Sequence, residues 1–483
     1  MFELPPEIIH SVCQHCEIRD IRALRQVSTA IKVIADEYML RSLRFTFDRQ
    51  DLVNMATLIN NNPYAARKLP EIHFQADRLP IVACQEEWEL CRLKTICDEA
   101  IWRGELQCAE RRTYEQPENS MELSSREATR YKILQRETSK YSQEEMNQAW
   151  TCYKEMMQDQ QAMDRAEEVF HCMTKIFKAS QRLETVTLTL KDRIRDDPLR
   201  WRRNEFYQRG MVRPWGDDGC WSPNTRVLNQ ILLAAHTTGT KLRKLNVMPL
   251  SYQFFRQEAS LMEKLHDTIM GLRHVHIQIN SNFGIDHEEE LAQRSTGIDH
   301  QSRPFSSSLR ASQTRITAAS EAARVIDALN DSRVYDLLSK ASDLEHLLFH
   351  GPETDTGLPK MKLNAIVGSC PWPKLRLLCL TTFECTETEL VKLVDNCRQS
   401  VACFCLADVL LTEGDWQNCF RRMAGRFPKG VDIVLKGRFG SRQTNQEILV
   451  CDPGHPFTHE LIRYLETGQD EPKAWLATPW VTL

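Results

Sequence analysis

Residues 4–47 read LPPEIIHSVCQHCEIRDIRALRQVSTAIKVIADEYMLRSLRFTF, and the interpretation of the whole chain depends on this stretch. Its two adjacent prolines suit the first turn of a helix, where a missing N–H would have no intrahelical partner anyway. Apolar side chains then recur at helical spacing in three successive short segments, 8–16, 21–27 and 31–38. The stretch is therefore predicted to form three short helices.

Two side chains are placed to begin the second and third of these helices. We expect Asp20 and Ser28 to be the caps, because such side chains accept hydrogen bonds from the backbone N–H groups of a first turn. Three short helices in about 40 residues bury too little surface to fold unaided. The pattern thus predicts a helical module that buries apolar surface against something else. The alternative at this point is the first layer of an ordinary helical domain.

Three runs in this stretch carry a family resemblance: Leu4-Pro5-x-Glu7-Ile8-Ile9, then Asp20-Ile21-x-x-Leu24-Arg25-x-Val27-Ser28, then Ile34-Ala35 with Leu40-Arg41. In this order they resemble an F-box, most closely the F-box at the N-terminus of fungal F-box proteins. The resemblance implies docking onto a Skp-type adaptor, which links a protein to a cullin-RING ubiquitin ligase. The residues that it assigns to this contact are Leu4, Pro5, Ile8, Ile9, Val12, Leu24 and Val27.

The composition is that of an ordinary globular protein. The chain has 483 residues, of which 42% are hydrophobic and 27% charged, so a sizeable core is expected. A net charge of −4 gives no argument for nucleic acid or a membrane as partner. The 17 cysteines are scattered and odd in number, and no signal peptide is recognisable, which predicts reduced thiols in the cytoplasm or nucleus. The sequence has no apolar run of the ~18 residues that would predict a membrane span.

A second pattern begins where the helical module ends. The phrase Leu40-x-x-Leu43-x-Phe45 predicts a strand, a helical segment follows, and the phrase returns as Leu69-x-x-Ile72-x-Phe74. Six further copies predict six further strands, at Leu183-Val186-Leu188, Leu242-Leu245-Val247, Leu272-Val275-Ile277, Leu344-Leu347-Phe349, Leu375-Leu378-Leu380 and Val401-Phe404-Leu406. A similar spacing at 228–233 is interpreted as helix.

The last two strands are the most informative, because residues 375–383 map onto residues 401–409 with a constant shift. Between them, Thr386 and Glu389 form the pattern of a capping box, and Asp415 stands at the start of the helix that follows the second strand. Strand-plus-helix units of about 20–29 residues are typical of leucine-rich repeats. Phe383 and Val409 replace the asparagine that closes the strongest versions of that repeat, so these units are predicted to be degenerate. The alternative is an α/β domain with a coincidental near-repeat.

These observations predict a mixed, helix-rich α/β fold in which a three-helix F-box precedes an irregular solenoid similar to leucine-rich repeats, with helical insertions. The predicted helices of the first insertion cover residues 83–109 and about 142–180, and a polar linker is expected at 111–125. The predicted organisation is an F-box at 1–47, a first strand–helix–strand unit with a helical insertion at 48–180, a repeat region at 181–466 with a disordered insert at 280–318, and a tail at 467–483.

Two groups of cysteines invite a metal or redox interpretation, and packing explains both better. His10, Cys13, His15 and Cys16 offer soft ligands, but no second ligand pair follows nearby, and the two cysteines share the apolar face of their helix. Cys84, Cys91, Cys97 and Cys108 have spacings that fit no metal-site pattern. No metal site and no cofactor are therefore expected.

The segment 193–221 interleaves arginines with tryptophans. Such a segment can bind phosphates and stack on bases, can recognise a protein, or can be a solvated insert with a few anchored aromatic side chains. His287 lacks the second histidine of a zinc-protease motif, and the nucleophile-elbow, phosphate-loop and dinucleotide fingerprints are missing from the sequence. No catalytic residue is predicted, and the chain is not expected to be an enzyme.

The sequence thus predicts a substrate-recognition adaptor of a Skp–cullin–F-box ubiquitin ligase. Its partners would be a Skp-family adaptor, a cullin reached through it, and a protein substrate held by the repeats. Two alternatives remain. One is an interaction scaffold outside a ligase, because Cys13 and Cys16 stand where the family usually has larger aliphatic side chains. The other is an enzyme with an unrecognised site. An adaptor must expose part of the Leu4–Val27 face, whereas an enzyme domain should bury it.

Overall fold

The computed structural model describes residues 4–39, 42–102, 120–190, 209–212, 223–279, 323–352, 360–369, 372–450, 456–472 and 481–482. In these ranges the chain is a mixed α/β protein, as predicted, with one sheet that is mostly parallel. The predicted insert at 280–318 and nearly all of the Arg/Trp-rich segment lie outside the described residues, as does Cys108. No helix in the described part is long and apolar enough to cross a membrane.

The first three helices are α1 (Pro6–His15), α2 (Ile18–Leu24) and α3 (Thr29–Asp36). Pro6 occupies the first turn of α1, and the Ser28 hydroxyl accepts a hydrogen bond from the Ile31 N–H at 3.2 Å, both as predicted. The predicted cap at Asp20 is wrong. Glu17 caps α2 instead, and Asp20 is its third residue, whose carboxylate accepts from the Glu17 N–H at 3.2 Å. This reciprocal capping box pairs two N–H donors that a cap at Asp20 would leave without partners.

These helices enclose a small core of their own. Cys13, Ile21 and Ala35 are fully buried, and the partly buried side chains of Ile9 and Leu24 pack against them. This core is separate from the main core of the molecule. Cys13 therefore acts as a packed apolar side chain, as the sequence indicated.

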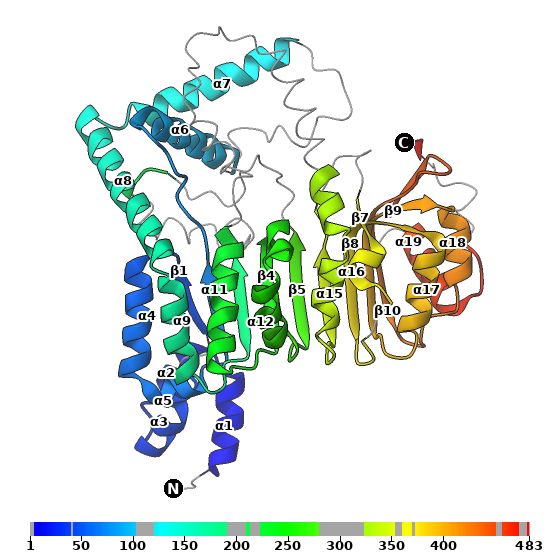
Figure 1. Cartoon of the computed structure of the whole chain (residues 1–483), viewed down its shortest axis with the longest axis horizontal. Helices are drawn as coiled ribbons and strands as arrows, with labels where there is room; N and C mark the ends of the chain where they lie inside the picture. Colours follow the sequence, from blue (N-terminus) through cyan, green and yellow to red (C-terminus); the bar gives the residue numbers. More distant parts are fainter. Residues whose placement is uncertain are drawn as a thin grey trace.

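All eight predicted strands are present. They are β1 (Ser42–Thr46), β2 (Glu71–Gln75), β3 (Thr185–Thr189), β4 (Lys244–Leu250), β5 (His274–Ile279), β6 (His346–His350), β8 (Leu377–Thr386) and β9 (Cys403–Glu413). They pair in chain order, each parallel to the next, and cross the molecule side by side (Figure 1). The constant shift is also confirmed, because Leu378 pairs with Phe404 and Phe383 with Val409.

Further strands extend this sheet beyond what the sequence phrase predicts. The short β7 (Met361–Lys362) pairs with β8, and β10 (Asp432–Ser441) is parallel to β9. The last two strands, β11 (Gln446–Val450) and β12 (Val481–Thr482), are antiparallel to their neighbours. Because β2 pairs with β3, the sheet runs across the predicted boundary at residue 180, and β12 brings part of the predicted tail into it.

One layer of helices covers one face of the sheet. In chain order these helices are α4 (Arg49–Asn61), α5 (Pro63–Lys68), α9 (Glu168–Ala179), α11 (Pro223–Thr238), α12 (Ala259–Ile269), α15 (Arg333–Ser339), α16 (Leu363–Val367), α17 (Glu387–Cys397), α18 (Trp416–Met423) and α19 (Pro456–Thr467). From α9 to α19 each helix contacts the next, and α4 contacts α9, so they lie on the same side (Figure 1). The expected capping box of α17 and the Asp415 cap of α18 are both present, and residues 228–233 are helical as predicted.

The strands alternate between a covered and an open face. Leu347 and Phe349 on β6 are completely buried, whereas Leu348 between them is only half-buried. The same alternation recurs on the neighbouring strands and follows from the period of two in a β-strand. The main core therefore lies between the sheet and the helix layer, and the opposite face of the sheet is available.

A helical insertion stands between β2 and β3. It comprises α6 (Gln85–Trp102), α7 (Ser120–Thr138) and α8 (Gln143–Arg165), with a separate core around Trp88 and Tyr153. The predicted helical region at 142–180 is two helices, because the chain breaks at Glu167, whose φ is +51°. The predicted polar linker is wrong for residues 120–125, which belong to α7; residues 111–119 lie outside the described part.

Because the helix layer covers one face of the sheet, replacing two adjacent leucines on β6 by alanine should lower the free energy of unfolding by unequal amounts. Leu347→Ala removes a fully buried side chain from the main core and should lower the free energy of unfolding by about 3 kcal/mol. Leu348→Ala, the matched control on the open face, should cost less than about 1 kcal/mol. Urea unfolding followed by circular dichroism measures both. Equal costs, or a larger cost at Leu348, would contradict the assignment of the two faces.

Candidate interaction surfaces

The first candidate surface is an apolar face on the N-terminal helices. Leu4, Ile8, Val12 and Val27 are 44–65% exposed, and Pro5 beside them is exposed as well. These are five of the seven side chains that the sequence assigned to adaptor contact. The other two, Ile9 and Leu24, turn inward and pack on the small core. We call the five exposed residues the apolar face.

The helical period explains why this face is exposed. Ile8 and Val12 are one turn apart on α1 and point outward together, whereas Ile9 and Cys13, each one residue further on, point inward. Exposed large apolar side chains that share one helix face, as Ile8 and Val12 do, are candidates for an interaction site. Because the core beneath them is already closed by Cys13, Ile21 and Ala35, the five residues do not belong to it.

Polar contacts fix the module on the rest of the chain. Glu37, which directly follows α3, forms an ion pair of 2.9 Å with Lys68 at the end of α5. His10 bonds to the Tyr38 hydroxyl at 3.0 Å, and Arg25 pairs with Asp36. The His10 ring is therefore engaged in packing α1 on the residues after α3. Among the residues that the structure describes, no three His, Cys, Asp or Glu side chains are grouped so that they could hold a metal ion.

The second candidate surface is the open face of the sheet. Its side chains form rows that run across the strands in register. One row, from β1 to β10, is Arg44, His73, Thr187, Asn246, His276, Leu348, Cys379, Cys405 and Val434. The row two residues earlier is Ser42, Glu71, Thr185, Lys244, His274, His346, Leu377, Cys403 and Asp432. Most of these side chains are half-buried or exposed.

Four histidines occupy the middle of this face, on the neighbouring strands β5 and β6. The Nδ1 atoms of His274 and His346 are 2.9 Å apart, and the Nε2 atoms of His276 and His350 are 3.1 Å apart. The remaining ring nitrogen of His350 bonds to the Thr381 hydroxyl at 2.9 Å. A hydrogen bond between two imidazole nitrogens needs one donor and one acceptor, so each pair requires one nitrogen that carries no proton. We call these four residues the histidine cluster.

The surroundings of the cluster oppose its protonation. Burial, then the neighbouring His350 and Lys244, lower the pKa of His276 to about 4. Burial and the charges of His346 and Lys244 also lower the pKa of His274. The imidazoles of His274 and His276 therefore remain neutral at neutral pH, in a region where nearby side chains supply positive charge.

Basic residues border the cluster where the strands begin. Arg243, Lys244, Arg273 and Arg376 lie at or directly before the first residues of β4, β5 and β8. Arg243 pairs with Glu184 at 3.3 Å and Arg273 with Glu345 at 3.6 Å. Lys244 and Arg376 are exposed and have no ion-pair partner among the described residues. The border therefore keeps a net positive charge.

The cysteines of this face occupy equivalent strand positions, as the repeat predicted. Cys379 and Cys405 are register partners on β8 and β9. A hydrogen bond between the two thiols lowers the pKa of Cys405 and raises that of Cys379. On the covered side, burial raises the pKa of Cys172 to about 11, as expected of a packed, unreactive thiol.

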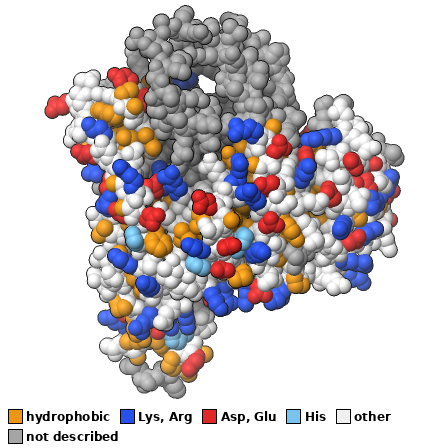
Figure 2. Space-filling view, viewed as in Figure 1, with side chains coloured by type: hydrophobic (Ala, Val, Ile, Leu, Met, Phe, Trp, Pro, Cys, Tyr) orange, Lys and Arg blue, Asp and Glu red, His pale blue; other side chains and the backbone are white. Residues whose placement is uncertain are grey.

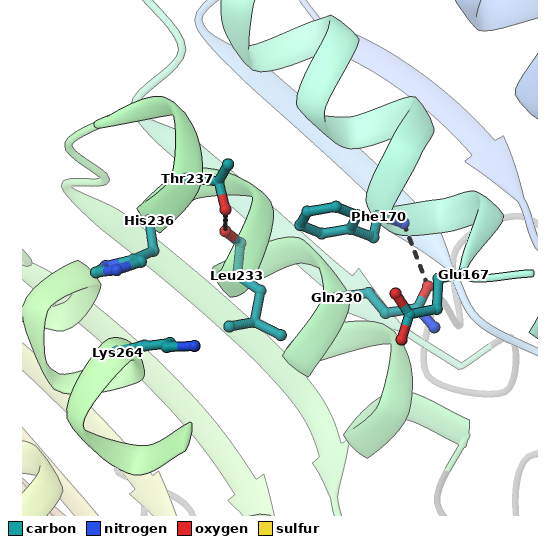
Figure 3. A pocket seen from close by; sticks show the side chains of 7 residues that line it. All are labelled: Glu167, Phe170, Gln230, Leu233, His236, Thr237 and Lys264. Carbon is teal, nitrogen blue, oxygen red and sulfur yellow. Dashed lines mark hydrogen bonds between the residues drawn. The ribbon is translucent and has the colours of Figure 1, made fainter. Parts of the chain in front are cut away.

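A shallow depression of about 320 Å³ lies on the outer side of the helix layer. Figure 3 shows its lining on α9, α11 and α12, where Gln230 accepts a hydrogen bond from the Phe170 N–H at 3.3 Å. Glu167, His236 and Lys264 bring both signs of charge to it, and Figure 2 shows basic and acidic side chains interspersed over this whole face. The depression lies on helices, whereas the enzyme alternative calls for a deep polar pocket at several strand ends.

No protein-family model matches this chain, and no curated protein matches it. Its function must therefore be inferred from the two surfaces. The apolar face was indicated by its residues in the sequence, but the histidine cluster was not. The signal for it was present, since the open positions of the repeated strand phrase hold histidine in two consecutive copies, His274 and His276, then His346 and His350.

The lowered pKa of His276 predicts a loss of stability in acid. The unfolded chain binds a proton near pH 6.5 and the folded chain only near pH 4, so stability is lost as the pH falls through this window. Between pH 7.5 and 5 this residue should cost about 1–2 kcal/mol, after allowance for the part of the ring that solvent screens. Urea unfolding at the two pH values measures the loss.

The His276→Gln variant should lose about 1–2 kcal/mol less free energy of unfolding between pH 7.5 and 5 than the native chain. His15→Gln, at the exposed end of α1, is the matched control and should leave the loss unchanged. An acid loss that is the same in the native chain and in His276→Gln would show that the ring does not contribute.

Proposed function

We propose that this chain is a substrate-recognition adaptor of a Skp–cullin–F-box ubiquitin ligase. The observation that carries the proposal is the apolar face: Leu4, Pro5, Ile8, Val12 and Val27 are exposed on a three-helix module that already has a closed core. A module of this size gains nothing in stability from such exposure, so the face is best explained by a partner that covers it. What the sequence resemblance implies for that partner is a Skp-type adaptor.

The seven residues assigned from the sequence divide into two roles in this proposal. The five residues of the apolar face contact the adaptor. Ile9 and Leu24 are positioning residues, because they hold α1 and α2 on the small core and so fix the direction in which the face points. The ion pair between Glu37 and Lys68 then fixes the module relative to the sheet.

The remainder of the chain is proposed to be a degenerate, leucine-rich-repeat-like solenoid that holds the protein substrate. Two features support this. The parallel strands follow one another in chain order, and in the described part of the chain the helix layer covers one face of the sheet, whereas a parallel sheet of an ordinary α/β domain is covered on both. Stacked repeats use such an open face for protein recognition. The chain would act by positioning: the partner enzyme supplies the reactive cysteine, and this chain raises the local concentration of substrate.

The double variant Ile8→Asp/Val12→Asp tests adaptor docking. Two carboxylates would be buried without partners in an apolar interface, at a cost of several kcal/mol. Co-purification and calorimetry with a Skp-type adaptor should give binding by the native chain and a loss of at least 100-fold in affinity for the variant. Both positions are exposed, so the variant should unfold at the same urea concentration as the native chain.

Val53→Asp is the matched control, since Val53 is 51% exposed on α4, outside the apolar face. It introduces the same group at similar exposure and should leave adaptor affinity unchanged. If the folded native chain does not bind the adaptor, the ligase proposal is wrong. The apolar face would then serve the runner-up function, an interaction scaffold outside a ligase.

A further inference from the structure

The histidine cluster and Lys244, one residue of its basic border, form one continuous region of the open face. His274 is the register partner of both Lys244 on β4 and His346 on β6, and His276 follows on the same face. Leu348 and Leu377 adjoin the cluster on β6 and β8, so the surface becomes apolar in that direction.

The described groups that face His274 and His276 carry more positive than negative charge. For His274 they are His346, Lys244, Glu345 and Arg273, and for His276 they are His350 and Lys244; Thr381 from β8 adds a neutral hydroxyl at His350. Glu345 is the only carboxylate in this described set, and it pairs with Arg273. An anion placed over the rings would therefore meet little opposing charge.

Protonation of the imidazoles and binding of an anion are linked at the histidine cluster. While one ring of a pair stays neutral, its unprotonated nitrogen still accepts the hydrogen bond between the rings, whereas protonation of both rings leaves no acceptor and breaks this bond. A carboxylate beside the rings supplies a new acceptor and a compensating charge, so it stabilises the imidazolium form. Binding of the carboxylate then draws protons onto the cluster.

We propose that the histidine cluster and its basic border bind an acidic segment, rich in Asp and Glu, of the protein partner, and that this binding is coupled to proton uptake by the imidazoles. The inference rests on the proposed function, in which the open face holds a protein substrate, and it names the chemistry of that substrate. Charge complementarity is the reason for choosing a carboxylate-rich segment. Lys244, the register partner of His274, attracts it, and the imidazoles supply donors once they are protonated.

The direction of the pH dependence follows from linkage. An acidic segment that raises the pKa of an imidazole binds more tightly as the pH falls, by up to about tenfold for each unit of pKa change on binding. Because glutamate side chains ionise near pH 4.3, the segment remains charged down to about pH 6. If the pKa of one imidazole rises from about 4 to its ordinary value of 6.5 on binding, affinity increases about fourfold between pH 7.5 and 6, and two such imidazoles give about a tenfold increase.

The experiment uses the intact chain and a fluorescein-labelled peptide of alternating glutamate and serine. Fluorescence polarisation at low salt measures its affinity at pH 7.5 and 6, with a peptide of alternating glutamine and serine as control. The native chain should bind the glutamate peptide about tenfold more tightly at pH 6 and should not bind the glutamine peptide. Failure to bind the glutamate peptide, or equal affinity at the two pH values, would overturn the proposal.

Two variants show which residues are responsible for peptide binding and for its pH dependence. His274→Gln/His276→Gln should abolish most of the pH dependence, whereas Lys244→Gln, at an exposed position, should weaken binding several-fold at both pH values. His73→Gln is the matched control, because His73 lies on the same open face on β2 and bonds to Thr189 at 2.8 Å. The proposal is wrong if His73→Gln lowers affinity as much as the cluster variants do.

The test of peptide binding can be distinguished from the test of adaptor docking. The Ile8→Asp/Val12→Asp chain should bind the glutamate peptide with native affinity, since its substitutions lie on α1. Adaptor binding without peptide binding would leave the ligase proposal in place and reject only the acidic substrate. Peptide binding without adaptor binding would reject the ligase while the acidic-binding surface stands.

Discussion

The burial of every second strand residue under one layer of helices is the constraint on which the rest of this structure depends. Leu347 and Phe349 on β6, and their register partners on β5 and β8, point into the same core. A slip of one residue in any strand would turn its apolar side chains to the open face. The register is therefore fixed by burial, and the composition of the open face is fixed with it. The histidine cluster is assembled because two strands share this register.

The strands could be predicted from the sequence because each of them must bury alternate residues under the helix layer, so the same pattern of apolar residues recurs in each. Three apolar positions per strand were enough to predict β1–β6, β8 and β9. The shift between Leu378 and Phe404 identified equivalent strand positions, which are register partners in the structure. The phrase stops before β10, where the repeat ends and the chain turns back in antiparallel strands, so β10, β11 and β12 were not predicted. The residue that caps α2 was harder to predict, because both Glu17 and Asp20 have a carboxylate that can accept a backbone hydrogen bond. The bond from the Glu17 N–H to the Asp20 carboxylate shows that the helix begins after Glu17.

The two candidate surfaces differ in how much of them the sequence reveals. The apolar face consists of residues close together in the chain, so a helical period separates Ile8 and Val12 from the buried Cys13. The histidine cluster joins residues such as His274 and His346, which are 72 positions apart and meet only through strand pairing. No local pattern shows that their nitrogens come within hydrogen-bonding distance. The sequence does show that these histidines occupy equivalent positions of the repeated strand pattern. This predicts a contact only when the two strands are known to be neighbours.

The continuous sheet also relates the two surfaces in space. The N-terminal helices lie at the β1 end of the sheet, and the histidine cluster begins on β5, four strands further along (Figure 1). At about 4.8 Å per strand, the cluster lies roughly 20 Å from β1 across the sheet. Hydrogen bonds join every strand between them, so this separation is set by the backbone and not by a flexible linker. A chain that works by positioning needs such a spacer, because a partner held at one end is then presented at a fixed distance from a partner docked at the other.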